Sequence, residues 1–226
     1  RGIFNVNNTK MFLDFLDSSD RQIILHQEYE VEQISLINEL IKKYSAIYFF
    51  DVGANCGYYS IKLAKNFKNL KVLAFEPNND AYFKFNKTLE INPYFSNRIT
   101  LYNYGLSDKN SKLMMKSLVK YGYTQTGGSS VNNDYQTDFK TQEAIFKVGD
   151  EEINIEESIV ALKIDVEGHE INALNGIKQF INKNKCIIQI EIFNENFEKV
   201  NQFLIDNKFH KITKAKTRPD YFYTNI

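Results

Sequence analysis

The sequence predicts an α/β fold in which a doubly wound, mostly parallel sheet carries helices on both faces. Short apolar runs, bounded by glycine, proline or polar residues, alternate with segments whose apolar residues recur every three or four positions. Connections of about three helical turns join parallel strands as crossovers. At 226 residues and 43% apolar content, the chain can bury the core of one such domain with an appendage.

The first elements fix the domain boundary. Apolar residues between Val31 and Tyr44 keep helical spacing, so residues 1–44 are expected to form a helical N-terminal cap. The run AIYFFDV at 46–52 is expected to be a strand buried on both faces. The main domain would then span residues 45–226. Its next expected elements alternate: helix 59–67, strand 71–77, helix 79–92, strand 99–105, strand 160–168, helix 171–181, strand 186–193 and helix 197–204.

The end of the chain and one long interval need a different explanation. Two closing strands, at 209–213 and 220–225, are separated by a turn too short for a crossover helix, so they should pair antiparallel. Residues 107–158 carry no strong helical pattern but include TGGSSV. A plain loop of that length is improbable in a compact domain, so we expect an insertion of short strands or loops over the site.

Composition bears on partners and location. Acidic and basic residues balance at 28 each, and only four of the bases are arginine, so we expect no nucleic-acid partner. No apolar stretch approaches the ~20 residues of a membrane span. Two cysteines, Cys56 and Cys186, are too few for a disulfide framework. These features favour a cytoplasmic protein, and they leave its oligomeric state open.

The stretch DVGANCG joins the first buried strand to the following helix. Ligands of an open parallel sheet bind beyond the carboxyl ends of its strands, which is where Asp51 and Gly53 fall. Gly53 permits close approach to the backbone, and Gly57 removes a side chain where the helix packs. Alternatively, Asp51 only caps the helix and the glycines only make a tight turn.

Glu76 ends the next strand, 25 residues after Asp51, in LAFEP. An acid at that position of a βαβ unit is placed to accept the hydroxyls of a ribose, although a solvated strand-end glutamate would look the same. The glycine spacing is not the G-x-G-x-x-G of dinucleotide sites, and Asp51 would repel a pyrophosphate. S-adenosylmethionine, which has a ribose, two cationic groups and no phosphate, fits better.

The segment KIDVEGHE supplies candidate catalytic residues. Asp165, Glu167 and His169 follow the fourth main strand, and alternation puts Asp165 and Glu167 on the same side. Asp165 is expected to orient an acceptor hydroxyl or take its proton, and neighbouring carboxylates should favour protonated His169. Structural roles, such as capping the next helix, remain open. Asp165, Glu167 and Glu191 could hold Mg²⁺, but nothing in the spacing requires a metal.

These motifs make the chain resemble the FkbM-type family of S-adenosylmethionine-dependent methyltransferases. The resemblance runs from about Phe12 to Phe193 and rests on YEVEQISLINELI, FDVGANCGYYSI, VLAFEPN, LYNYGLSD and LKIDVEGHEINALNGI. It implies a Rossmann-like class I methyltransferase fold, with a seven-stranded sheet whose last strand is antiparallel. It also implies O-methylation of a hydroxyl on a sugar or another polyhydroxylated metabolite, so the expected partner is a small-molecule or glycan acceptor.

The resemblance also assigns cofactor residues. The methionine end of S-adenosylmethionine would be held by Asp51, Gly53, Ala54, Asn55 and Gly57. Glu76 and Pro77 would contact the ribose, and Gly105, Ser107 and Asp108 would flank the adenine. Two other functions compete with this one: a nicotinamide-dependent oxidoreductase, and a non-catalytic nucleoside-binding module of the same fold. The glycine spacing disfavours the first, and the carboxylates of KIDVEGHE disfavour the second.

Overall fold

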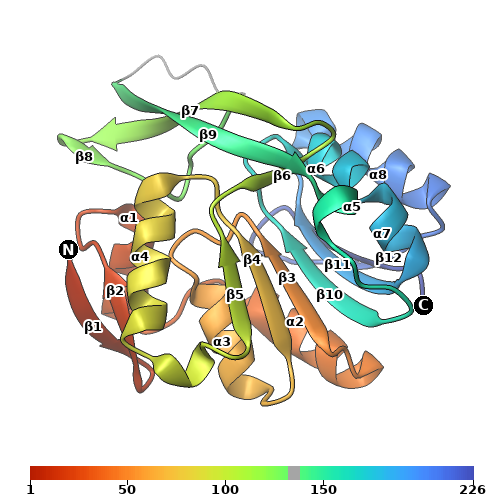
Figure 1. Cartoon of the computed structure of the whole chain (residues 1–226), viewed down its shortest axis with the longest axis horizontal. Coiled ribbons are helices and arrows are strands. Elements are labelled where there is room, and N and C mark those ends of the chain that lie inside the picture. The colour runs from red at the N-terminus through yellow and green to blue at the C-terminus, as the bar shows by residue number, and fades with distance from the viewer. Residues whose placement is uncertain (132–137) are drawn as a thin grey trace.

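A seven-stranded sheet forms the centre of the protein (Figure 1). The structure is a computed structural model that describes residues 1–131 and 138–226. Only β13 runs antiparallel to its neighbours in this sheet, and the other pairs are parallel. The strands are, in spatial order, β12 (His210–Lys214), β13 (Asp220–Thr224), β11 (Lys185–Glu191), β10 (Ile159–Ile164), β3 (Tyr48–Val52), β4 (Lys71–Phe75) and β5 (Ile99–Tyr102).

Helices cover both faces of the sheet, because strands such as YFFDV are apolar on both sides. One core cluster joins the sheet to α2, α3 and α4, and a second joins it to α6, α7 and α8. Within the described residues, no helix has the length and apolar character of a membrane span. The helices of these two layers are α2 (Val31–Tyr44), α3 (Tyr58–Asn66), α4 (Asn79–Glu90), α6 (Glu170–Gly176), α7 (Lys178–Lys183) and α8 (Phe197–Asp206).

The strand register aligns the carboxyl ends of the central strands. Val52 at the end of β3 pairs with both Phe75 of β4 and Ile164 of β10. Ile164 pairs in turn with Ile190 of β11. The residues that follow each strand therefore meet at one edge, which is where the sequence predicted a ligand.

The N-terminal cap is only partly helical, so the expected cap of helices is wrong for its first residues. β1 (Gly2–Val6) and β2 (Thr9–Leu13) form an antiparallel hairpin, and α1 (Ser18–His26) follows. Asn7 and Asn8 both have positive φ, as a two-residue hairpin turn of type I′ requires. The hairpin packs against α4, at the left of Figure 1.

The insertion is more regular than the expected short strands or loops. It consists of β6 (Gly105–Ser107), β7 (Ser111–Lys120), β8 (Tyr123–Thr124), β9 (Phe139–Val148) and α5 (Gly149–Glu152). Its two long strands, β7 and β9, pair antiparallel and cross the top of the view in Figure 1. Because β6 follows β5 directly, this second sheet stands at the carboxyl edge of the main sheet.

The single helix expected over residues 171–181 is divided into two helices. Between β10 and β11, α6 ends at Gly176 and α7 begins at Lys178. A Cβ on Gly176 would lie 2.0 Å from the carbonyl oxygen of Ser107, so the close packing of α6 on β6 requires glycine here.

Candidate active site

A deep cleft lies at the carboxyl edge of the main sheet and contains about 920 Å³ of space, counting the part that opens to solvent. Its walls come from the glycine turn after β3, the ends of β4 and β10, the cap and the insertion. Ten residues predicted from the sequence line it: Asp51, Gly53, Ala54, Asn55, Glu76, Pro77, Gly105, Asp165, Glu167 and His169. The strand-end argument therefore brings together residues that are more than 100 positions apart.

Three expected cofactor residues do not line this cleft in the described structure. Gly57 packs against α4, where an added Cβ would lie 2.3 Å from the ring of Phe85. Ser107 and Asp108 line a neighbouring hollow instead. His169 lines both this hollow and the main cleft.

The glycine turn interlocks two strand ends. Gly53 has φ +84°, and an added Cβ would lie 1.9 Å from the carbonyl oxygen of Asp165. The amides of Gly53 and Ala54 both donate to the carbonyl of Phe75, at 3.0 and 3.1 Å. A side chain at position 53 would force the β3 and β10 ends apart, so glycine is needed here for packing as well as for its backbone angles.

Of the two carboxylate oxygens of Asp51, one accepts hydrogen bonds from the protein and the other has no described partner. Its Oδ2 accepts hydrogen bonds from the amide and the hydroxyl of Ser60, at 3.1 and 2.6 Å, in the first turn of α3. Its Oδ1 is buried and has no hydrogen-bond partner among the described residues. Burial raises the pKa of this carboxyl. The capping role and a ligand-facing role are therefore compatible, because each uses a different oxygen.

Glu76 is buried at the end of β4 and organises the backbone around it. Its two oxygens accept hydrogen bonds from the amides of Asn55 and Asn78, each at 2.7 Å. Burial raises the pKa of Glu76 to about 7. Since an ionised carboxylate has about four lone-pair positions, two remain for a ligand in the cleft.

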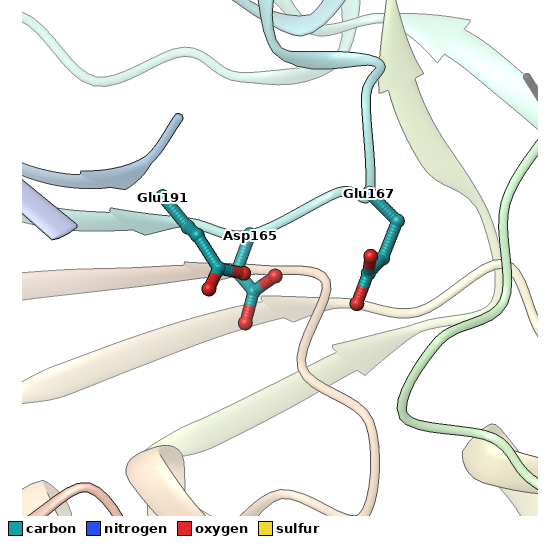
Figure 2. A group of neighbouring side chains, drawn as sticks. All are labelled: Asp165, Glu167 and Glu191. Atoms are coloured by element: carbon teal, nitrogen blue, oxygen red, sulfur yellow. The ribbon is translucent and has the colours of Figure 1, made fainter. Parts of the chain in front are cut away.

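Asp165, Glu167 and Glu191 form an acidic cluster at the ends of β10 and β11. One carboxylate oxygen from each lies within 4.8 Å of the others, and Figure 2 shows the three groups directed to the same side of the chain. Burial and the charge of Asp165 raise the pKa of Glu167 to about 8 and that of Glu191 to about 9. At neutral pH the cluster therefore holds protons.

Lys163 was not singled out from the sequence. It projects from β10 into the cleft, is 4% exposed, and pairs in register with Asp51 of β3. Its ammonium lies 2.7 Å from Oδ2 of Asp165 and 4.8 Å from the ring centroid of Tyr59. Burial alone would raise the pKa of Asp165, but Lys163 holds it below its usual value. A lone charge inside the apolar run VALKI was the signal that could have identified Lys163.

His169 differs from its prediction. Its imidazole Nε2 lies 3.0 Å from the hydroxyl of Ser107, and its ring centroid is 5.2 Å from that of Phe146. Burial lowers the pKa of His169, and the nearby charge of Asp108 only partly opposes this. The expectation that carboxylates favour its protonated form is wrong, because burial outweighs them and the ring contacts Ser107 and Phe146 of the insertion.

The cap and the insertion form a roof over the glycine turn that the sequence did not reveal. The Thr126 hydroxyl lies 2.7 Å from Oδ2 of Asp17 and 2.9 Å from Oδ1 of Asn55. Buried Lys84 joins the same group through Asp17 and Asp20. The cleft-lining residues missed from the sequence include Ser19, Ile23, Tyr29, Tyr58, Tyr59, Met115, Thr126, Gly127 and Phe146.

Ser129 and Ser130, the two serines of the TGGSSV stretch in the insertion, are both buried. The Ser129 hydroxyl accepts a hydrogen bond from the side-chain amide of Asn78 at 2.9 Å. The Ser130 hydroxyl donates to the carbonyl of Glu167 at 2.6 Å. The two serines therefore fasten the insertion to the cleft floor.

The sheet order and the cleft at its carboxyl edge define the class: the protein has the fold of the class I, Rossmann-like methyltransferases. Within that class, a family model described as the methyltransferase FkbM domain matches residues 51–212, and the chain belongs to this family. A comparison with curated protein sequences found no match.

Solved structures support the fold. The methyltransferase FkbM from Methylobacillus flagellatus KT is 17% identical, with a TM-score of 0.55 over 79% of this chain and 43% of that one. A protein assigned as an rRNA methylase from Clostridium thermocellum is 15% identical, with a TM-score of 0.53 over 87% of this chain and 96% of that one. A protein assigned as a caffeoyl-CoA O-methyltransferase from Staphylococcus aureus is 9% identical, with a TM-score of 0.51 over 87% of this chain and 84% of that one. The chain thus spans less than half the length of the first protein.

Proposed function

We propose that the protein is an S-adenosylmethionine-dependent methyltransferase that methylates a hydroxyl oxygen on a sugar or another polyhydroxylated small molecule or glycan. The observation that carries the proposal is the set of polar side chains that line the cleft. Among the described residues, four carboxyl side chains line it, against one ammonium, that of Lys163. Such a wall is rich in acceptors for hydroxyl and ammonium groups and poor in donors for the pyrophosphate of a dinucleotide.

The residues present fit the cofactor. The free oxygen of Asp51 suits an ammonium group, and the free lone pairs of Glu76 suit the two ribose hydroxyls. Beyond them, Leu106, Met115 and Phe146 give the cleft an apolar end that suits an adenine ring. When bound, S-adenosylmethionine supplies a methyl group already activated on a sulfonium.

Two carboxyl groups divide the work on the acceptor. Asp165, kept ionised by Lys163, accepts a hydrogen bond from the acceptor hydroxyl and orients it. Glu167 also lines the cleft, and its pKa of about 8 makes it a better proton acceptor than Asp165. We therefore assign to Glu167 the role of taking the hydroxyl proton and to Asp165 the role of orientation.

A divalent cation is the alternative to this division. Asp165, Glu167 and Glu191 could each offer one oxygen to Mg²⁺. Lys163 already supplies a counter-charge to Asp165, however, and its hydrogen bond uses one of that carboxylate's oxygens. We therefore propose a reaction that needs no metal.

A thermal-shift comparison tests the function. We expect S-adenosylmethionine and S-adenosylhomocysteine to raise the melting temperature, and NAD to leave it unchanged. Stabilisation by NAD alone would replace the methyltransferase with an oxidoreductase. If both sulfur compounds bind but no polyhydroxylated acceptor is methylated in a screen with labelled S-adenosylmethionine, a non-catalytic nucleoside-binding module becomes the better description.

A further inference from the structure

Lys163 has hydrogen-bonding capacity that the protein does not use. A lysine ammonium carries three N–H groups. Among residues 1–131 and 138–226, the one on Lys163 donates a single hydrogen bond, to Asp165, and makes one cation–π contact, with Tyr59. At 4% exposure it has little access to water, so at least one N–H lacks an acceptor among the described residues, at a position that lines the cleft.

The adjacent strand offers the opposite case. Asp51 is the register partner of Lys163, so both side chains leave the sheet on the same face. In the described structure, five buried side-chain atoms have no hydrogen-bond partner, and Oδ1 of Asp51 is the one that belongs to a cleft-lining residue. An unused cationic donor and an unused anionic acceptor therefore stand side by side in the same wall.

We propose that Lys163 and Asp51 together form a receptor for a zwitterion, in which Lys163 binds the α-carboxylate and Asp51 binds the α-ammonium of the amino-acid end of the cofactor. This inference rests on the proposed function and deepens it. It makes Lys163 the residue by which the cleft selects an adenosyl amino acid over other adenosyl compounds. Neither group needs a new partner from the protein, because the ligand fills both vacant positions.

The competing explanation is that Lys163 only neutralises the acids around it. A purely structural lysine in this interior would be expected to have its donors saturated by protein acceptors, as buried polar groups generally are. Lys84, the other buried lysine described here, contacts three oxygen atoms: one each on Asp17, Asp20 and Thr126. The unsaturated state of Lys163 and its position in the cleft wall distinguish it.

Isothermal titration calorimetry with three ligands tests the receptor. S-adenosylhomocysteine carries both charged groups, its decarboxylated analogue keeps only the amine, and 5′-methylthioadenosine lacks both. In the wild-type protein, we expect removal of the carboxylate to weaken binding by at least about tenfold. In Lys163→Met, the affinity for S-adenosylhomocysteine should fall at least about tenfold, while the affinity for 5′-methylthioadenosine stays within about twofold of wild type.

Asp51→Asn is the complementary variant. It should weaken the binding of the two amine-bearing ligands and leave the affinity for 5′-methylthioadenosine within about twofold of wild type. Circular dichroism checks that each variant is folded, and the wild-type ligand series tests whether the cleft binds the carboxylate even if a variant does not fold. Equal wild-type affinity for S-adenosylhomocysteine and its decarboxylated analogue would overturn the receptor while leaving the proposed function in place. Failure of all three ligands to bind would overturn both.

Discussion

Two lysines are buried among the residues that the structure describes, and their surroundings differ. Lys84, on α4, is 0% exposed, and its ammonium lies 2.6 Å from Asp20, 3.0 Å from Thr126 and 3.4 Å from Asp17. Lys163, on β10, is 4% exposed and has one hydrogen-bond acceptor among the described residues, Asp165. Burial alone would lower the pKa of both, but neighbouring carboxylates raise it instead.

The difference shows how a buried charge can serve two purposes. Lys84 does not line the cleft, and its donors are used to join α1, α4 and the insertion. Asp20 also has a buried oxygen without a described partner, but Asp20 does not line the cleft either. Lys84 therefore stabilises the fold, whereas Lys163 keeps capacity for a ligand.

The largest effect should come from Lys84→Met. Removing one member of a buried charge network leaves its acids unpaired, so the free energy of unfolding should fall by about 3–5 kcal/mol. Urea unfolding followed by circular dichroism measures this. Lys87→Met is the matched control on the same helix, because its ion pair with Glu90 is exposed and should contribute under about 0.5 kcal/mol. A similar loss for both variants would contradict the distinction.

Glu167→Gln should lower turnover about a hundredfold, because the amide cannot take the acceptor proton. The pKa of Glu167, about 8, sets the sign of the pH dependence: wild-type turnover should rise as pH rises through 8 and then level off. The variant should lose that rise. Glu157→Gln is the control, since Glu157 is exposed and has a similar left-handed backbone, with φ 53° against 51°. Turnover within about twofold of wild type in Glu167→Gln would reassign the proton to Asp165 or His169.

Glu76→Gln should lower the affinity for S-adenosylhomocysteine about 30-fold, which is about 2 kcal/mol of binding free energy. The substitution removes the charge from the acceptor of the ribose hydroxyls. Wild-type affinity should also fall as pH drops below about 7, where the Glu76 carboxyl takes up a proton. Calorimetry between pH 6 and 8 checks both. Glu90→Gln, on the surface, should bind normally; an unchanged affinity in Glu76→Gln would remove Glu76 from the ribose site.

The smallest effect is expected from metal removal. Because the Lys163 ammonium already balances Asp165, treatment with EDTA should leave turnover within about twofold, and added Mg²⁺ should not raise it. Turnover assays with and without chelator measure this. Loss of activity in EDTA, restored by Mg²⁺, would instead assign the acidic cluster to a cation.

The parts of the structure that were predictable from sequence are those set by local pattern. The alternation of apolar runs and amphipathic segments predicted the central strands, and the strand-end rule brought Asp51, Glu76 and Asp165 to one cleft. The antiparallel closing pair followed from its short connection, and it is confirmed. The N-terminal hairpin was missed although its Asn7-Asn8 turn is a recognisable signal, because each strand has only five residues.

The parts that were not predictable depend on contacts between distant segments. Nothing near Thr126 or Asp17 in the sequence indicates that they meet over Asn55. The pKa of His169 depends on which way its ring turns, and that is decided by Ser107 and Phe146 rather than by the carboxylates beside it in sequence. Burial, which decides most of these charge states, is a property of the whole fold.

The roof network also has a consequence for the order of assembly. Its hydrogen bonds join residues far apart in the chain: 109 positions separate Asp17 from Thr126, and 107 separate Ser18 from Gln125. Contacts of such long sequence separation close slowly, after local helices and neighbouring strands have formed. A folding chain will therefore bring Asp51 and Glu76 together, through the neighbouring strands β3 and β4, before it acquires their cover. Competence to enclose a ligand becomes one of the last properties gained in folding.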